Sequence, residues 1–170
     1  MTNTQVVAVE SRQIMTVTAL NDLSDIQLSE HFRLSEFTRS AVALRYDIDN
    51  TPDIEDIEAL QSLCIHVLEP LRKKFGVLKI TSGYRSPMLN AKVKGVPNSQ
   101  HMKGQAADIF ISSNEVARKY YDYIRQNLVY DQLILEMKTI RGVGHVHCLH
   151  VSYNNEGENR RQAISNYRLR

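Results

Sequence analysis

The chain has 170 residues, of which 42% are hydrophobic and 24% are charged, and its formal net charge is +2 at pH 7. This length suits one domain with a single hydrophobic core. The small net charge argues against a nucleic-acid-binding protein, and no apolar run is long enough to span a membrane, so we expect neither role. We expect a monomer in which Cys64 and Cys148 are free thiols.

The N-terminal segment carries no recognisable chemistry. Residues 1–27 are weakly patterned and are interpreted as an extension with at most one strand, at Ile14–Leu20, whereas residues 28–170 are expected to form the domain. The segment Met1–Glu10 lacks the basic start and long apolar stretch of a secretory signal. We therefore expect synthesis in a cytoplasm without a signal peptide.

Helical patterns dominate the first half of the domain. Ser35 can cap a helix that runs through Leu44. A longer helix is expected to begin at the N-cap Thr51 and to end at Gly76, because apolar residues recur between them at helical spacing. Pro70 lies inside this helix and should kink it or split it in two.

Strand patterns dominate the second half. A helix is expected around Met88–Val93, and Ser112 with Glu115 has the spacing of a capping box that opens another helix. The expected strands are Leu78–Thr81, Ala106–Ile111, Asp131–Met137 and Val146–Tyr153. Together these elements predict an α+β fold, with a small, mostly antiparallel sheet and helices packed on one side.

Two histidines and an aspartate carry the strongest chemical signal. His101 and Asp108 are separated by a loop that contains Gly104, so a turn entering a strand can bring both side chains to one ion. Asp108 lies in the apolar segment Ala106–Ile111, where an unpaired charge would be very costly. Together with His150 in a later strand, they predict a three-ligand Zn²⁺ site whose fourth position is open for water, as in catalytic zinc sites.

An alternative explanation of these residues remains open at this point. His150 could be a hydrogen-bonded residue of the sheet, and Asp108 could pair with an arginine. The sequence also contains four segments in a recognisable order: Ser82–Pro87 (SGYRSP), Ser99–Asp108 (SQHMKGQAAD), Asp131–Ile134 (DQLI) and His150–Tyr153 (HVSY).

These segments resemble the family of zinc D-Ala-D-Ala carboxypeptidases and L-alanyl-D-glutamate endopeptidases, which shares its fold with the hedgehog signalling domain and the vancomycin-resistance dipeptidases. The likeness extends roughly from Leu28 to the end, and is to the short single-domain members of phages and prophages. It implies that His101, Asp108 and His150 bind zinc. It also implies that Arg85 binds the substrate carboxylate or polarises the scissile carbonyl, and that the substrate is a cell-wall peptide containing D-amino acids.

The general base is expected to be Glu136. Many members of the family carry Glu or Asp three residues before the last zinc histidine, but here that position is His147. Glu136 lies on the expected partner strand of His150, in a register that places it opposite residues 148–150. A slip of one residue would turn the carboxylate to the other face of the sheet.

Three further residues are candidates for the site. His147 could act as an alternative base, and His145 could contact the substrate. By strict alternation these two histidines share a face with each other and not with His150, unless a bulge intervenes. Ser99 could hydrogen-bond a ligand or the substrate.

The expected function is that of a zinc metallopeptidase that hydrolyses peptidoglycan stem peptides, as a D-Ala carboxypeptidase or as a lytic endopeptidase of the endolysin type. Such an enzyme would act on the cell wall, after release at phage lysis or as part of a virion. The alternative is a non-catalytic, zinc-containing cell-wall or protein-binding module of the same fold, and a third possibility is a phage structural protein. An intact base at Glu136 would favour the enzyme.

Overall fold

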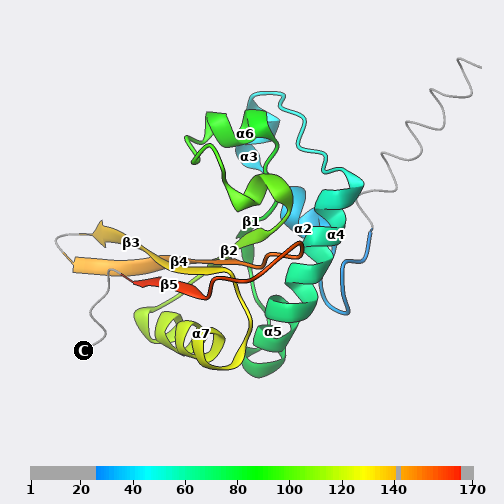
Figure 1. The fold of residues 1–170 in the computed structure, drawn as a ribbon. Coiled ribbons are helices and arrows are strands. Elements are labelled where there is room, and N and C mark those ends of the chain that lie inside the picture. The colour runs from blue at the N-terminus through cyan, green and yellow to red at the C-terminus, as the bar shows by residue number, and fades with distance from the viewer. Residues whose placement is uncertain (1–25, 141–142, 166–170) are drawn as a thin grey trace, which may run out of the picture.

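A five-stranded sheet forms the centre of the molecule (Figure 1). The computed structural model describes residues 26–140 and 143–165, so the strand expected at Ile14–Leu20 lies outside the described residues. The strand order is β1-β2-β4-β3-β5, and all neighbours are antiparallel except the parallel pair β3 and β5. The strands are β1 (Ile80–Ser82), β2 (Ala106–Phe110), β3 (Gln132–Ile140), β4 (Val143–Ser152) and β5 (Gln162–Ser165).

Helices complete an α+β fold, as predicted. In Figure 1, α5 (Glu69–Phe75) and α7 (Asn114–Asn127) lie below the sheet, where they cover its apolar face. The short helices α3 (Ala41–Arg45) and α6 (Pro87–Lys92) lie above it. Among the described residues, no helix is both long enough and apolar enough to cross a bilayer.

The core fills the space between the sheet and the long helical segment. Strand alternation sends every second side chain of β2, β3 and β4 into this core and its neighbours to the opposite face. The fully buried residues of the two layers include Leu60, Leu63, Val67, Leu68, Leu71, Ile109, Ile124, Leu133, Leu149 and Val151. Each such side chain contributes about 1.5–3 kcal/mol through its burial. The packed core therefore holds the sheet rigid, together with the side chains on its opposite face.

The first predicted helix is in fact two short ones. The helix α2 (Leu34–Thr38) contains Ser35, which therefore does not act as a cap. Arg39 is extended, and the side chain of Ser40 caps α3 instead. The prediction of one continuous helix was wrong because the apolar residues fit either arrangement, and the cap at Ser40 selects the second.

The long helical segment begins two residues later than predicted. Its N-cap is Asp53 rather than Thr51, and α4 covers Ile54–Leu63. The Asp53 carboxylate accepts a hydrogen bond from the backbone N–H of Asp56, and the Asp56 carboxylate accepts one from the backbone N–H of Asp53. This reciprocal capping satisfies two helix-end donors, which Thr51 could not do alone.

A wide turn accommodates Pro70. The segment η1 (Cys64–Leu68) is π-helical and connects α4 to α5, in which Pro70 occupies the first turn. Proline has no N–H to donate, and its ring would crowd the preceding turn of a regular helix. The wider π-helical turn avoids this crowding. The segment ends at Gly76, as predicted, with a φ of 90°.

Several features of the second half differ from the prediction. Strand β1 begins two residues later than predicted, β3 ends three residues later and β4 begins three residues earlier. Ser113, not Ser112, caps α7 by accepting a hydrogen bond from the backbone N–H of Val116. Strand β5 was not predicted, because its four residues lack alternating hydrophobicity and only the pairing with β3 makes them extended. Cys64 and Cys148 are free and buried, and burial raises the pKa of the Cys148 thiol to about 12.

Candidate metal centre

Neighbouring strands place two of the expected ligands side by side. Asp108 on β2 and His150 on β4 are direct partners in the antiparallel register. His101 belongs to η2 (Gln100–Lys103), the 3₁₀ turn that immediately precedes β2. Among the described residues, these three form the one group whose ligand atoms could share a metal ion, all within 4.8 Å of one another.

The spacing of the ligand atoms fits zinc. Oδ1 of Asp108 lies 3.2 Å from Nε2 of His101 and 2.9 Å from Nδ1 of His150, and the two ring nitrogens are 3.3 Å apart. Two ligands of a tetrahedral Zn²⁺ with bonds of about 2.0–2.1 Å are about 3.3 Å apart. Two imidazole nitrogens and one carboxylate oxygen are also a donor set that zinc accepts while leaving its fourth position open.

The orientation of His101 is fixed by the main chain. Its Nδ1 lies 2.6 Å from the carbonyl oxygen of Gly83, so Nδ1 must carry the proton and donate it. Nε2 therefore faces Asp108 and His150, and its lone pair becomes available to a metal when Nε2 carries no proton, as in other metal-ligating histidines. The backbone N–H of Arg85 donates to the carbonyl oxygen of His101 at 3.1 Å, which ties the same turn down from its other side.

Arg85 holds the other oxygen of Asp108. Its Nη2 donates to Oδ2 of Asp108 at 2.7 Å, and its Nε donates to the hydroxyl of Ser82 at 2.9 Å. The Asp108 side chain is only 11% exposed. Pairing with an arginine is therefore not an alternative to a metal site, because the arginine and the histidines approach different oxygens of one carboxylate.

The histidines keep Asp108 ionised. Burial by itself raises the pKa of this carboxyl, but hydrogen bonds and charge from His101 and His150 outweigh burial and hold the pKa well below its usual range. The carboxylate is thus ready to bind a cation without first losing a proton.

Two adjoining cavities open onto the three ligands. A cavity of about 530 Å³ contains His101, Asp108 and His150, and it is bounded by β3 and by the loop around Ser99. A neighbouring cavity of about 500 Å³ extends toward α3 and β1. The residues that line both cavities are Arg85, Lys94, Gly95, Asp108 and Glu136. The two cavities therefore meet beside the ligands, and we call them together the cleft.

Glu136 lies in the cleft with the expected register. Ile134 pairs with His150, and Glu136 pairs with Cys148, so Gln132, Ile134 and Glu136 share the face of β3 that carries the site. Diagonal neighbours in an antiparallel pair are about 7 Å apart, which brings the Glu136 side chain within reach of the space above His150. Its carboxylate is exposed to the cleft.

A β-bulge decides where the other two histidines lie. His147 is the extra residue between the pairs Glu136–Cys148 and Met137–Val146, so strict alternation fails at this point. The bulge turns His145 to the face that carries His150. The Nδ1 of His147 lies 3.0 Å from the backbone oxygen of Glu136. Neither His145 nor His147 is among the residues that line the cleft.

The loop that bears Ser99 is fastened by a residue that no sequence motif indicates. Ser99 is buried and lines the cleft. The buried Asn90 on α6 donates from its Nδ2 to the carbonyl oxygen of Val96 at 2.9 Å. A Cβ at Gly95 would lie 2.0 Å from the Asn90 Oδ1, so a larger residue there would displace the Asn90 side chain. Sequence patterns likewise do not predict that Lys94 lines the cleft.

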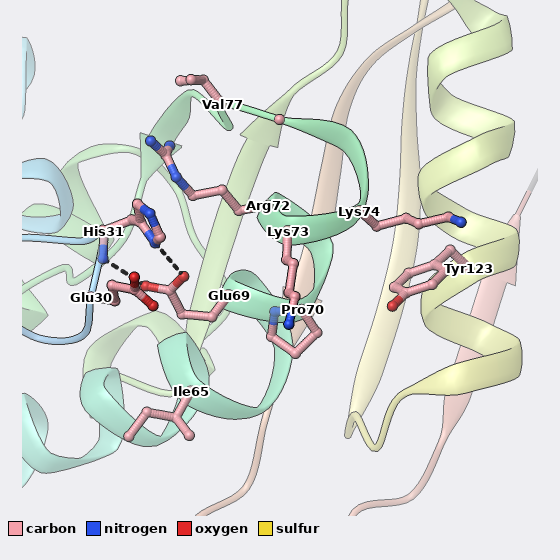
Figure 2. A pocket seen from close by; sticks show the side chains of 11 residues that line it. Glu30, His31, Ile65, Glu69, Pro70, Arg72, Lys73, Lys74, Val77 and Tyr123 are labelled. Carbon is pink, nitrogen blue, oxygen red and sulfur yellow. Dashed lines mark hydrogen bonds and ion pairs between the residues drawn. The ribbon is translucent and has the colours of Figure 1, made fainter.

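A cavity larger than either part of the cleft lies elsewhere and is not the site. It measures about 1130 Å³ and is bounded by α5, α7 and the segment before α2 (Figure 2). Its central carboxylate, Glu69, accepts hydrogen bonds from the Ser29 hydroxyl and from the backbone N–H of His31, and it also contacts the His31 ring. Through these contacts Glu69 joins residues 29–31 to α5, so its carboxylate is already engaged.

The fold and the three expected ligands are compatible with a metallopeptidase-type centre, and the comparison of sequences agrees. A family model described as Peptidase M15 matches residues 30–148, which is more than half of the chain. The chain therefore belongs to the Peptidase M15 family, whose members are zinc peptidases. The match ends two residues before His150, so the third expected ligand, on β4, lies beyond the matched segment. No curated protein matches the chain.

Zinc is expected to stabilise the folded protein. At about one hundred times its dissociation constant, a ligand that binds only the native state adds about 2.7 kcal/mol, which for this length raises Tm by about 5–10 °C. Thermal unfolding of the metal-free protein with and without Zn²⁺ measures the shift. Mg²⁺ should have little effect, because it disfavours imidazole ligands. An equal shift in His101→Ala would contradict the assignment.

Gly104 is expected to be irreplaceable between His101 and Asp108. Its φ is 62°, and a Cβ there would lie 2.1 Å from the backbone oxygen of Asp56. Gly76 is a matched control, because its φ is 90° but a Cβ would meet nothing within 4 Å. Gly104→Ala carries left-handed backbone strain of about 1–2 kcal/mol and about 1–3 kcal/mol from the contact, whereas Gly76→Ala carries backbone strain alone, of about 1–3 kcal/mol. Urea unfolding tests this, and equal losses would contradict it.

Proposed function

We propose that the protein is a zinc-dependent peptidase that hydrolyses peptide bonds in peptidoglycan stem peptides. The observation that carries the proposal is the triangle of His101, Asp108 and His150, which opens into a cleft that also contains Glu136 and Arg85. Membership of the Peptidase M15 family supports peptide hydrolysis as the reaction. The peptidoglycan substrate rests on the resemblance of the four sequence segments described above.

The three ligands would hold the zinc ion, and the protein supplies the other groups. A bound Zn²⁺ would provide Lewis acidity, which lowers the pKa of a coordinated water and polarises a carbonyl group. Glu136 would accept a proton from the attacking water and later donate it to the leaving amine nitrogen. Its place across from Cys148, on the face that carries His150, supports this role.

Arg85 would act in two ways. Its Nη2 holds Asp108 in the orientation that presents Oδ1 to the histidines. Because the guanidinium also lines both parts of the cleft, its remaining N–H groups could bind a substrate carboxylate or the developing oxyanion. Ser99 would contact the substrate from the opposite wall.

His145 and His147 lie outside the cleft and would act indirectly. The ring of His147 contacts the backbone of Glu136, so His147 would position the base rather than replace it. His145 lies on the far side of the same bulge and would contact only a substrate that extends beyond the cleft. The site of action would be the cell wall, reached after lysis or on a virion.

Mass spectrometry of purified muropeptides tests the proposal. Zinc-loaded protein should release products that a chelator prevents, and the product masses would identify the bond that is cut. A protein that binds zinc but leaves every muropeptide intact would contradict the proposal, and it would favour a binding module of the same fold.

A further inference from the structure

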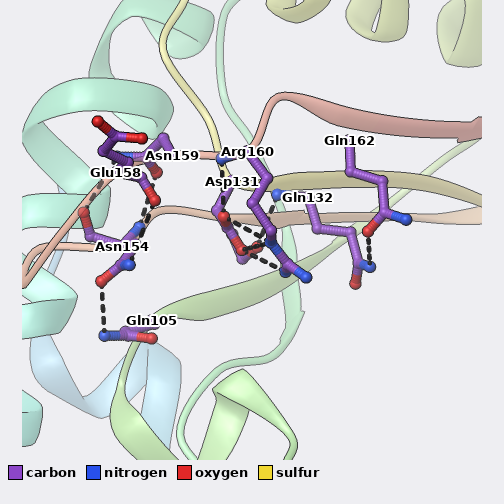
Figure 3. A network of polar contacts seen from close by, with 9 residues as sticks. Gln105, Asp131, Gln132, Asn154, Glu158, Asn159, Arg160 and Gln162 are labelled. Atoms are coloured by element: carbon purple, nitrogen blue, oxygen red, sulfur yellow. Dashed lines mark hydrogen bonds and ion pairs between the residues drawn. The ribbon is translucent and has the colours of Figure 1, made fainter.

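A second arginine lies on the wall of the cleft, at the end away from Glu136. Arg160 lines the cavity that contains the three ligands, and its side chain is 58% exposed. It belongs to the segment between β4 and β5, beyond residues 30–148 matched by the family model. Figure 3 shows the Arg160 side chain lying against Asp131, with Gln132 beside it.

Asp131 holds the guanidinium of Arg160 side-on. The Nε of Arg160 donates to Oδ1 at 2.9 Å and to Oδ2 at 3.1 Å, and its Nη2 donates to Oδ2 at 2.5 Å. The backbone N–H of Arg160 also donates to Oδ1 at 3.0 Å. The Asp131 side chain is only 4% exposed, so a buried carboxylate fixes the orientation of an arginine that faces the cleft.

In this arrangement one edge of the Arg160 guanidinium is bound to Asp131, and another edge remains available for a second ligand. A guanidinium has five N–H groups, and a carboxylate bound side-on takes the Nε–H and one Nη2–H. Of the three remaining N–H groups, two, one on Nη1 and one on Nη2, lie together on a neighbouring edge that Asp131 does not occupy. That edge can bind a second carboxylate through two parallel hydrogen bonds, and little side-chain entropy is lost because the arginine is already held.

The charges of the cleft favour an anionic ligand at this end. The acidic residues among the cleft-lining set are Asp108 and Glu136, of which Asp108 already contacts Arg85 and both histidines. Lys94 adds a positive charge where the two cavities meet, on the side of Glu136. A carboxylate near Arg160 would therefore meet a cation on the wall, at a distance from Glu136.

The register of β3 gives the distance from the metal ligands. Gln132, beside Arg160, precedes Ile134 by two residues, and Ile134 is the direct partner of His150. Two residues of a strand span about 7 Å, which is also about two residues of an extended peptide. Glu136 lies the same distance from Ile134 on the other side.

We propose that Arg160, held by Asp131, is a specificity-determining residue that binds a carboxylate of the peptide substrate about two residues from the scissile bond. This inference rests on the proposed function for the identity of the ligand as a peptide. A stem peptide offers two such carboxylates, one at its C-terminus and one on its γ-linked glutamate. The structure supports the binding of a carboxylate at Arg160, and the experiment determines which of the two carboxylates binds there.

The test uses three synthetic stem peptides: one with both carboxylates, one amidated at the C-terminus and one amidated at the glutamate. Binding is measured by calorimetry to zinc-loaded Glu136→Gln protein, so that turnover does not interfere, and hydrolysis is measured separately with Glu136 intact. We expect one of the two amidations to weaken binding about tenfold or more. In Arg160→Gln this difference should vanish, with the binding of that amidated peptide unchanged.

Two further variants separate recognition from stability. Arg160→Lys should retain part of the preference, because it keeps the charge but not the bidentate edge. Arg161→Gln is the matched control, because the Arg161 guanidinium instead contacts the backbone of Arg125 and the ring of Tyr130. This control should keep the full preference.

The outcomes distinguish the inference from the proposed function. If neither amidation weakens binding, or if Arg160→Gln keeps the preference, the inference is overturned even when the peptides are hydrolysed. If the preference depends on Arg160 but no peptide is cut, the inference stands and the enzymatic proposal fails. Failure of all three peptides to bind would overturn both.

Discussion

Glu136→Gln is expected to lower kcat for peptide hydrolysis by about 10²- to 10⁴-fold, the usual contribution of general acid–base catalysis. Glutamine has nearly the same shape as glutamate but cannot accept a proton from water at neutral pH. The backbone of residue 136 pairs with Cys148 and does not depend on the side chain, so the sheet should be unaffected. Initial rates on a purified stem peptide, measured with zinc content, test this result.

The zinc content of Glu136→Gln should equal that of the wild type, because Glu136 is outside the ligand triangle. Glu58→Gln provides a matched control, since Glu58 is an exposed carboxylate on α4 that does not line the cleft. A Glu136→Gln protein with full activity would show that another group is the base. His147 would then be the first residue to substitute.

Asp108→Ala is expected to abolish both zinc binding and activity. The substitution removes one of three ligands, so zinc affinity should fall by more than the roughly 10- to 100-fold that follows loss of a residue that only supports a ligand. Metal analysis after dialysis measures the loss. Asp122→Ala on α7, away from the cleft, should retain its zinc.

The same variant should also be less stable without metal. Arg85 donates to Asp108 at 2.7 Å, and the Arg85 side chain is only 19% exposed. Loss of its carboxylate partner leaves a largely buried cation unpaired, at a cost of about 1–3 kcal/mol or more. Urea unfolding of the two metal-free proteins measures this cost separately from zinc binding. One zinc retained per Asp108→Ala molecule would contradict the ligand assignment.

Local sequence patterns were sufficient for the elements that contain their own signals. The strand around Asp108 is apolar on both sides, the end at Gly76 needs a residue of positive φ, and both were predicted correctly. The N-cap residues of the helices were predicted less accurately. Thr51, Ser112 and Ser35 are all residues that cap helices well, but a neighbour one to five residues later makes the better hydrogen bonds in each case.

Elements that depend on distant partners were not predictable. Strand β5 is extended because β3 pairs with it, and its own residues carry no alternating pattern. The bulge at His147 inserts one residue into β4, which changes the face on which His145 lies. A one-residue change of register reverses every side chain beyond it, and no local propensity encodes that change.

The sequence by itself determined which residues are expected to bind a metal, because His101, Asp108 and His150 are zinc-ligand types in segments that a loop and two strands can bring together. Only the tertiary structure decided how the site is arranged. It divides the two oxygens of Asp108 between Arg85 and the histidines, it places Glu136 one strand pair from His150, and it brings Arg160 to the cleft. These relations join residues far apart in the chain, and packing of the sheet brings them together.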